Sequence, residues 1–284
     1  MEFRKIGIVG AGTMGSSLAH LLVRETTASV MLCDISKKML ERANLFTEKE
    51  LAKLAKKRPI DVDQLEAMKT RLSTTTELND LCCADIVITA VTEDLETKQK
   101  VFRDLDQCVP PEAILATCTS GLSVTAIASA VEENHRVIGL HFFYPAHIIK
   151  LVEIVRGMET SDEVFEQAQA FCISLGKEVI VTEDSPGFAT TRLVAVYINE
   201  AIFALHEGLA SAEDIDRGMK LGYNMPIGPL AFADRIGLDV LLSELETLYR
   251  DYGDPKYRPC ILLRKKVESG QLGRKTGDGF FEYG

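Results

Sequence analysis

The sequence predicts an α/β protein in which a doubly wound sheet is followed by an all-α domain. Up to about residue 184, short apolar runs alternate with helix-like segments, a pattern typical of parallel strands joined by helical crossovers. After the turn cluster at 183–187, every later segment has helical periodicity. We therefore expect two domains, at residues 1–184 and 185–284.

The first apolar run, at 5–9, leads directly into a glycine-rich turn and a helix-like pattern. In that order, Gly10 permits a tight turn, Gly12 lets a pyrophosphate approach the backbone, and Gly15 lets the helix pack on the sheet. The free amides at the helix start would face the phosphates. The alternative is a glycine turn without a ligand. The predicted cofactor contacts here are Gly10, Ala11, Gly12, Thr13, Met14 and Gly15.

A second apolar run ends at Asp34, 19 residues after Gly15. An acid at this place accepts hydrogen bonds from an adenosine ribose and repels a 2′-phosphate. NAD is therefore the predicted cofactor; NADP is disfavoured but not excluded, since Lys37 and Lys38 lie close by. The strand, glycine turn, helix and acid together predict a Rossmann-type domain.

Further short segments, most of them apolar, predict the rest of the sheet. Strands are expected at 71–74, 85–91, 113–117, 136–140, 151–155 and 177–181. Helices are expected at 37–58 (capped by Ser36 and ended by Pro59), 62–70, 96–105, after Ser123, and at 162–175. Four polar residues stand at the carboxyl ends of predicted strands, the edge where such sheets bind ligands: Asp34, Glu93, Ser120 and His141.

The C-terminal part predicts only helices. We expect them at 188–208 with Gly208 as C-cap, at 212–221 capped by Ser211, within 227–252 with breaks at Pro229 and Gly237, and at 259–269. These helices carry more apolar side chains than an isolated bundle of about 100 residues can bury. Packing against a second copy would cover the surplus, so a homodimer is expected.

Composition narrows the function classes. Of 284 residues, 46% are hydrophobic and 26% charged, as in a globular protein, and the net charge of −10 argues against a nucleic-acid partner. No apolar run approaches the roughly 20 residues of a membrane span. A strand begins within a few residues of the N-terminus, which predicts no signal peptide. The seven cysteines lack C-x-x-C spacing, so we expect reduced thiols, a cytoplasmic location and no metal site.

A dinucleotide site implies hydride transfer, which needs a base to take the hydroxyl proton. Among the five histidines, His141 is the best candidate because it stands at a strand's carboxyl end; His147 is its rival. Glu153 lies 12 residues further on, where a short reversal would bring its carboxylate to the imidazole. The alternative is a core histidine held by a nearby acid.

Other residues allow two interpretations each. Ser120 could donate a hydrogen bond to the substrate oxygen or serve as a turn or cap serine. Glu93 and Lys98 could bind the nicotinamide-side ribose or be solvated. Lys275, in a glycine-flanked basic loop, could lie near the cofactor or on a plain surface loop. A basic patch could bind an anion or be a solvated helix face; it comprises Lys49, Lys53, Lys56, Lys57 and Arg58.

With these residues assembled, the chain resembles the short-form 3-hydroxyacyl-CoA dehydrogenases of the 3-hydroxybutyryl-CoA dehydrogenase kind, nearly end to end. The shared segments are the glycine turn, 90–93, 119–120, 139–143, 150–153, 184–188 and 272–277. The resemblance implies reversible, NAD-linked oxidation of an L-3-hydroxyacyl-CoA to the 3-ketoacyl-CoA. It further implies that His141 is the general base, Glu153 its partner and Ser120 a substrate contact. Glu93, Lys98 and Lys275 match cofactor contacts, and Lys57, beside Lys53, matches a contact to the CoA phosphates.

Three residues depart from the family pattern: Cys118, Tyr144 and Thr191 replace asparagines in or next to the family's active site. Tyr144, as a cofactor contact, and Thr191, as a catalytic-site residue, keep a hydroxyl. An unsatisfied buried partner costs about 1–3 kcal/mol, enough to alter substrate choice. We therefore also expect, as an alternative, the same chemistry on an acyl-carrier-protein thioester or another specialised hydroxy acid. A non-catalytic NAD-binding protein is a further alternative.

Overall fold

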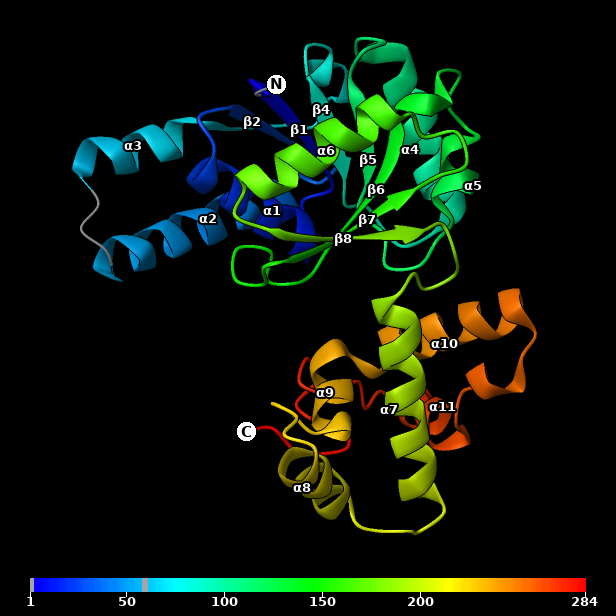
Figure 1. The fold of residues 1–284 in the computed structure, drawn as a ribbon. Coiled ribbons are helices and arrows are strands. Elements are labelled where there is room, and N and C mark those ends of the chain that lie inside the picture. Colours follow the sequence, from blue (N-terminus) through cyan, green and yellow to red (C-terminus); the bar gives the residue numbers. More distant parts are fainter. Residues whose placement is uncertain (1–2, 58–60) are drawn as a thin grey trace. The chain divides into compact units, whose positions relative to one another are not determined.

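The chain divides into two units, one ending at Ser185 and the other beginning at Pro186. The computed structural model describes residues 3–57 and 61–284. The first unit is built on a sheet and the second from helices (Figure 1). This arrangement confirms the predicted fold class.

The sheet has eight strands in the order β3-β2-β1-β4-β5-β6-β7-β8. Strands β1 to β6 all run parallel to one another, β7 is antiparallel to β6, and β8 is parallel to β7. The sheet is therefore mixed, because the short reversal before β7 returns the chain alongside β6. The bounds are β1 Lys5–Val9, β2 Ser29–Cys33, β3 Leu72–Thr75, β4 Ile86–Thr89, β5 Ile114–Thr117, β6 Val137–Phe142, β7 Leu151–Arg156 and β8 Glu178–Glu183.

Most of the strands are connected by α-helices. Two short 3₁₀ helices, η1 and η2, also lie between strands. The bounds are α1 Thr13–Glu25, α2 Lys37–Lys57, α3 Val62–Thr70, η1 Leu78–Leu81, α4 Leu95–Cys108, α5 Val124–Ala128, η2 Asn134–Arg136 and α6 Asp162–Ser174. Ser123 caps α5 as expected, accepting from the amide of Ala126. Helix α4 starts one residue early because Asp94 caps it, accepting from the amide of Thr97. The predicted end of α2 at Arg58 and Pro59 lies outside the described residues.

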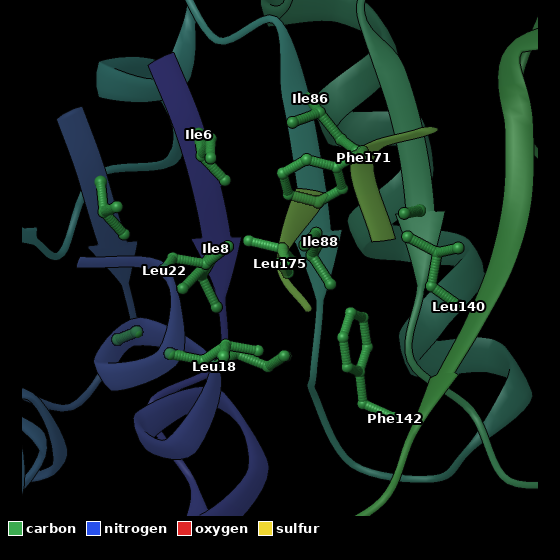
Figure 2. Close-up of a cluster of buried hydrophobic side chains, with 14 of the residues drawn as sticks. Ile6, Ile8, Leu18, Leu22, Ile86, Ile88, Leu140, Phe142, Phe171 and Leu175 are labelled. Carbon is green, nitrogen blue, oxygen red and sulfur yellow. The ribbon is translucent and has the colours of Figure 1, made fainter. Parts of the chain in front are cut away.

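One face of the sheet is covered by α1 and α6. Figure 2 shows Leu18 and Leu22 of α1, Phe171 of α6 and Leu175 just after α6 meeting side chains of β1, β4 and β6. Each such buried side chain contributes about 1.5–3 kcal/mol of transfer free energy. Helices α2 and α3 instead project past the β2–β3 side of the sheet as a helical arm (Figure 1). The strand residues in this core are Ile6, Ile8, Ile86, Ile88, Leu140 and Phe142.

In the second unit, α7 contacts all four other α-helices. Helix α7 begins two residues later than expected, because Phe188 has a left-handed φ of 48° that helical backbone excludes. Gly208 (φ 73°) follows its end, and Gly237 (φ 105°) separates α9 from α10. None of the helices in the described part of the chain is long and apolar enough to cross a membrane. The bounds are α7 Thr190–His206, α8 Ala212–Gly222, α9 Pro229–Ile236, α10 Leu238–Tyr252, η3 Pro255–Tyr257 and α11 Ile261–Glu268.

Candidate active site

The glycine turn between β1 and α1 has the form that a dinucleotide needs. A Cβ on Gly10 would lie 2.6 Å from the carbonyl oxygen of Ala90, and one on Gly15 would lie 1.7 Å from that of Gly10. Packing therefore requires glycine at both positions. A Cβ on Gly12 would meet no protein atom within 4 Å, so its backbone is open to an approaching pyrophosphate. No side chain caps the first turn of α1, which leaves its amides available to an anion.

Asp34, at the end of β2, lies against this turn. Its carboxylate accepts a hydrogen bond from the amide of Ala11 at 2.7 Å and another from the amide of Ser36 at 2.8 Å. These two bonds orient a half-buried acid beside the glycine turn, where a ribose would lie. The residues present therefore fit an adenine dinucleotide.

His141 and Glu153 lie directly opposite each other on antiparallel strands β6 and β7. The distance from Nδ1 of His141 to Oε2 of Glu153 is 2.6 Å, and both side chains are buried. A carboxylate can only accept, so Nδ1 carries the proton and Nε2 is the basic nitrogen. The ring of Phe143 lies 4.3 Å from the imidazole ring between centroids. The spacing of 12 residues in the sequence thus predicted a real contact.

Glu93 organises the chain segment that carries Ser120. Its Oε1 accepts from the amide of Ser120 at 2.9 Å and from the hydroxyl of Thr119. Its Oε2 lies 3.2 Å from Nζ of Lys98, whose side chain is fully buried, so the solvated interpretation of Lys98 is wrong. Ser120 does not cap α5, since Ser123 does. These residues therefore form one network at the carboxyl ends of β4 and β5.

The loop after β6 is held by contacts that the sequence did not reveal. The hydroxyl of Ser17, in α1, accepts from the amide of Ala146 at 2.8 Å. The ammonium group of Lys177 donates to the carbonyl oxygens of Ala146 and Ile149. No sequence signal marks either residue, because a serine inside a helix and a lysine before a strand are ordinary.

His147 lies in this loop, its ring against α1 and α2. Its Nε2 lies 3.8 Å from a carboxylate oxygen of Glu50, and its Nδ1 lies 3.4 Å from the hydroxyl of Ser17. Burial lowers its pKa. Its ring also meets that of His20 edge-on, 4.8 Å away between centroids. The carboxylate of Glu50 is therefore beyond hydrogen-bond distance from His147, whereas that of Glu153 lies 2.6 Å from His141.

Asp184 is a further residue whose role sequence analysis missed. It accepts from the hydroxyl of Ser123 at 2.8 Å and from the amides of Val124 and Thr125 at 2.9 and 2.7 Å. It thereby holds the start of α5 just beyond the Ser120 segment. The sequence showed it only as part of a turn cluster and of a segment, 184–188, that resembles the family.

Two of the three departures from the family pattern lie in the first unit. The half-exposed side chain of Tyr144 lines a cavity of about 170 Å³ together with Ala11, Gly12 and Thr13. Cys118 packs against the core, and burial raises the pKa of its thiol to about 11. It therefore stays a neutral thiol at pH 7 and offers no amide.

The remaining predicted residues lie elsewhere. Thr191 is buried in the first turn of α7, and Lys275 forms an ion pair with Asp239; both belong to the second unit. Lys53 is exposed on α2 and pairs with Glu50 at 2.6 Å. Lys57 is the last residue of α2, and its side chain lies outside the described part of the molecule.

Comparison with known proteins gives consistent matches over the full length. Residues 5–185 match the family model of the 3-hydroxyacyl-CoA dehydrogenase NAD binding domain, and residues 187–283 match that of its C-terminal domain. A probable 3-hydroxybutyryl-CoA dehydrogenase of Bacillus subtilis is 42% identical over 283 residues, covering 100% of this chain and 98% of the relative. A 3-hydroxybutyryl-CoA dehydrogenase of Bradyrhizobium diazoefficiens is 41% identical over 280 residues (99% and 95%). The crystal structure of (S)-3-hydroxybutyryl-CoA dehydrogenase from Ralstonia eutropha superposes with a TM-score of 0.95 at 42% identity, covering 100% of both chains.

Proposed function

The chain belongs to the 3-hydroxyacyl-CoA dehydrogenase family of NAD-dependent oxidoreductases, and we propose that His141 is its general base and Glu153 the group that orients this base. The enzyme oxidises an L-3-hydroxyacyl-CoA reversibly to the 3-ketoacyl-CoA. The observation that carries the proposal is the 2.6 Å bond between Nδ1 of His141 and Oε2 of Glu153. It leaves Nε2 as the nitrogen that can take a proton.

In this mechanism the imidazole of His141 accepts the proton of the substrate's 3-hydroxyl at Nε2. Glu153 holds the Nδ1 proton and stabilises the imidazolium that forms. Ser120, whose position Glu93 sets, donates a hydrogen bond to the substrate oxygen. NAD, held by the glycine turn and Asp34, supplies the hydride acceptor when bound.

The preferred substrate in this proposal is a short-chain thioester, 3-hydroxybutyryl-CoA. The relatives named for that activity match the whole chain, which supports the choice. Lysines on α2, among them Lys53 and Lys57, would contact the CoA phosphates. The enzyme would work as a homodimer that associates through its helical unit.

The test is a turnover assay of the purified chain with (S)-3-hydroxybutyryl-CoA and NAD, followed by NADH absorbance. We expect His141→Gln to lower kcat by at least about 10³-fold, since a general base contributes about 10²–10⁴-fold, while NADH binding is unchanged. His135→Gln is the matched control, because His135 is exposed in η2, just before the same strand. Near-normal turnover by His141→Gln would remove this residue as the base.

The alternative acyl carrier is an acyl-carrier protein, favoured by the replacements at Cys118, Tyr144 and Thr191. Comparing kcat/KM for 3-hydroxybutyryl groups on CoA and on acyl-carrier protein distinguishes the two. A preference for the protein-bound thioester of more than about 10-fold, about 1.4 kcal/mol, would favour the specialised substrate. NADH binding without turnover of either thioester would indicate a non-catalytic protein.

A further inference from the structure

Two adjacent cysteines, Cys82 and Cys83, are exposed at the end of η1, just before β4. Their sulfur atoms are 3.6 Å apart. Because β4 runs parallel to β1, this turn lies at the amino ends of these strands. The glycine turn and Asp34 lie beyond the carboxyl ends of β1 and β2. The thiol pair is therefore separate from the proposed active site.

The turn that carries the two thiols is fixed on both sides. The carboxylate of Asp85 accepts from the amides of Arg4 and Lys5 at 2.7 and 2.9 Å, which ties the turn to the start of β1. Within the turn, the amide of Cys82 donates to the carbonyl of Asn79. Leu81 is only 2% exposed and anchors the turn in the core. The backbone that carries the thiols is thus held in place before any ligand arrives, which lowers the entropic cost of binding.

A cavity of about 270 Å³ adjoins Cys83, which forms part of its wall. The lining is mostly apolar and includes Gly7, Val30, Met31 and Leu81. An apolar cavity of about 150 Å³ is large enough for benzene. The cavity is therefore large enough for an aryl group. If Cys83 binds an atom that carries such a group, the group can lie in this cavity.

The distance between the two sulfur atoms indicates whether the pair suits a disulfide or a bridge through a single bound atom. A disulfide needs sulfurs about 2.05 Å apart and α-carbons usually about 4.4–6.8 Å apart, whereas neighbouring α-carbons are about 3.8 Å apart. A disulfide between these residues would therefore be strained. A single atom bound to both sulfurs at about 2.3 Å, the zinc–sulfur distance, can bridge separations up to about 4.6 Å. The observed 3.6 Å fits the bridge without rearrangement.

The number of protein ligands available at this site limits which atom can bind to the two sulfurs. Structural zinc takes four protein ligands. Among the described residues there is no cluster of three or more histidine, cysteine or acidic side chains able to hold a metal ion. Cys108, the nearest further thiol in the sequence, points its sulfur toward the carbonyl of Leu78. The site therefore suits a thiophilic atom that needs only two thiolates because it carries an organic group of its own.

We propose that Cys82 and Cys83 form a binding site for trivalent organoarsenicals of the form R–As=O, with the organic group in the adjoining cavity. In the reaction, two S–H bonds and the As=O bond break and two As–S bonds form. The oxygen leaves as water with both thiol protons. No electrons are transferred, and arsenic stays trivalent.

The probe is phenylarsine oxide, added to the reduced, purified chain and followed by intact-protein mass spectrometry. We expect one adduct per chain that resists excess 2-mercaptoethanol and is released by 2,3-dimercaptopropanol. Peptide mapping should place it on the segment containing Cys82 and Cys83. Cys82→Ser and Cys83→Ser should each weaken binding at least about 100-fold, because each converts a chelate into a single bond.

Cys108→Ser is the matched control and should bind phenylarsine oxide as the unaltered chain does. NADH binding by all three variants reports whether they remain folded, independently of turnover. The proposal is overturned if the unaltered chain forms no monothiol-resistant adduct or if mapping places the adduct elsewhere. It is equally overturned if either serine variant at 82 or 83 retains full binding.

Discussion

Glu153 is fully buried, and its carboxylate contacts the imidazole of His141. Replacing it by glutamine keeps an oxygen that can accept from Nδ1 but removes the negative charge that stabilises imidazolium. We expect Glu153→Gln to lower kcat by roughly 10²-fold with KM for NAD unchanged. Steady-state kinetics over a range of pH measure this effect.

Glu178→Gln is the control for that substitution, because Glu178 lies on the neighbouring strand β8 but is exposed. It should leave kcat unchanged. If both variants retained normal kcat, the carboxylate of Glu153 would have no part in orienting the base.

Gly12 and Gly15 belong to one motif, but glycine is required at the two positions for different reasons. Alanine at Gly15 would place Cβ 1.7 Å from a backbone oxygen, so Gly15→Ala should lower the free energy of unfolding by several kcal/mol, about 3 or more. Alanine at Gly12 meets no protein atom, so Gly12→Ala should remain folded but lose at least about 10-fold in NADH affinity. Chemical denaturation and NADH fluorescence measure the two effects. Equal loss of stability in both variants would contradict this assignment.

At the scale of the element, we expect the stability of the packing between α1, α2 and the loop after β6 to depend on pH. Burial, and next the charge of His147, lower the pKa of His20 from 6.5 to about 4. Its Nδ1 has no hydrogen-bond partner in the described structure. Below pH 6.5 the unfolded chain takes up this proton while the folded chain does not. The free energy of unfolding therefore falls as the pH drops from about 6.5 to about 4.

His20→Leu removes this titration. Between about pH 7 and pH 4.5 the free energy of unfolding should fall in both proteins. We expect the fall to be smaller in the His20→Leu variant than in the unaltered chain by about 2 kcal/mol. Urea denaturation at both pH values measures the difference. His135→Leu, which alters an exposed histidine, is the control and should retain the full loss. A variant at His20 with an unchanged pH dependence would show that this residue does not carry the effect.

At the scale of the whole molecule, the helical unit exposes large apolar side chains. Leu193, Leu209, Leu221 and Tyr223 are each more than 70% exposed, at 72, 78, 79 and 73%. Exposed apolar side chains at several places on one unit favour an interaction surface there, and a second copy of the chain is the partner we propose. We expect sedimentation at about twice the chain mass of 31.3 kDa.

Leu221→Lys should raise the dimer dissociation constant at least about 10-fold, because dimerisation would bury an unpaired charge. Val62→Lys is the control: Val62 is 70% exposed but lies on α3 of the other unit. A monomer for the unaltered chain, or equal effects of both substitutions, would exclude dimerisation through the region around Leu221.

The fold could be predicted from patterns among neighbouring residues, such as apolar runs, helix caps and short spacings. All eight strands were expected near their observed places. The central strands β1, β4, β5 and β6 are buried, almost wholly apolar runs, whereas the edge strands β3 and β8 are largely exposed. The shifted helix ends have local causes that pattern alone does not reveal. Phe188 adopts a left-handed conformation, and Asp94 caps α4. The His141–Glu153 pair was within reach of prediction because a short reversal places residues 12 apart opposite each other.

Other parts of the candidate site depended on contacts between distant segments. Ser17 bonds to a residue 129 positions away, and Asp184 bonds to one 60 positions away. A short-range pattern gives no sign of such partners, since hydrogen bonds across the fold depend on how complete elements pack.

The sequence thus sufficed for the order of strands and helices, the glycine turn with its acid, and the histidine with its carboxylate. Each of these is encoded in neighbouring residues or in one short spacing. Only the tertiary structure decided that Lys98 is buried, that His147 packs against α1 and α2, and that two sulfurs of one turn lie 3.6 Å apart beside a cavity. Burial, orientation and empty space are properties of many segments packed together, and no single segment contains them.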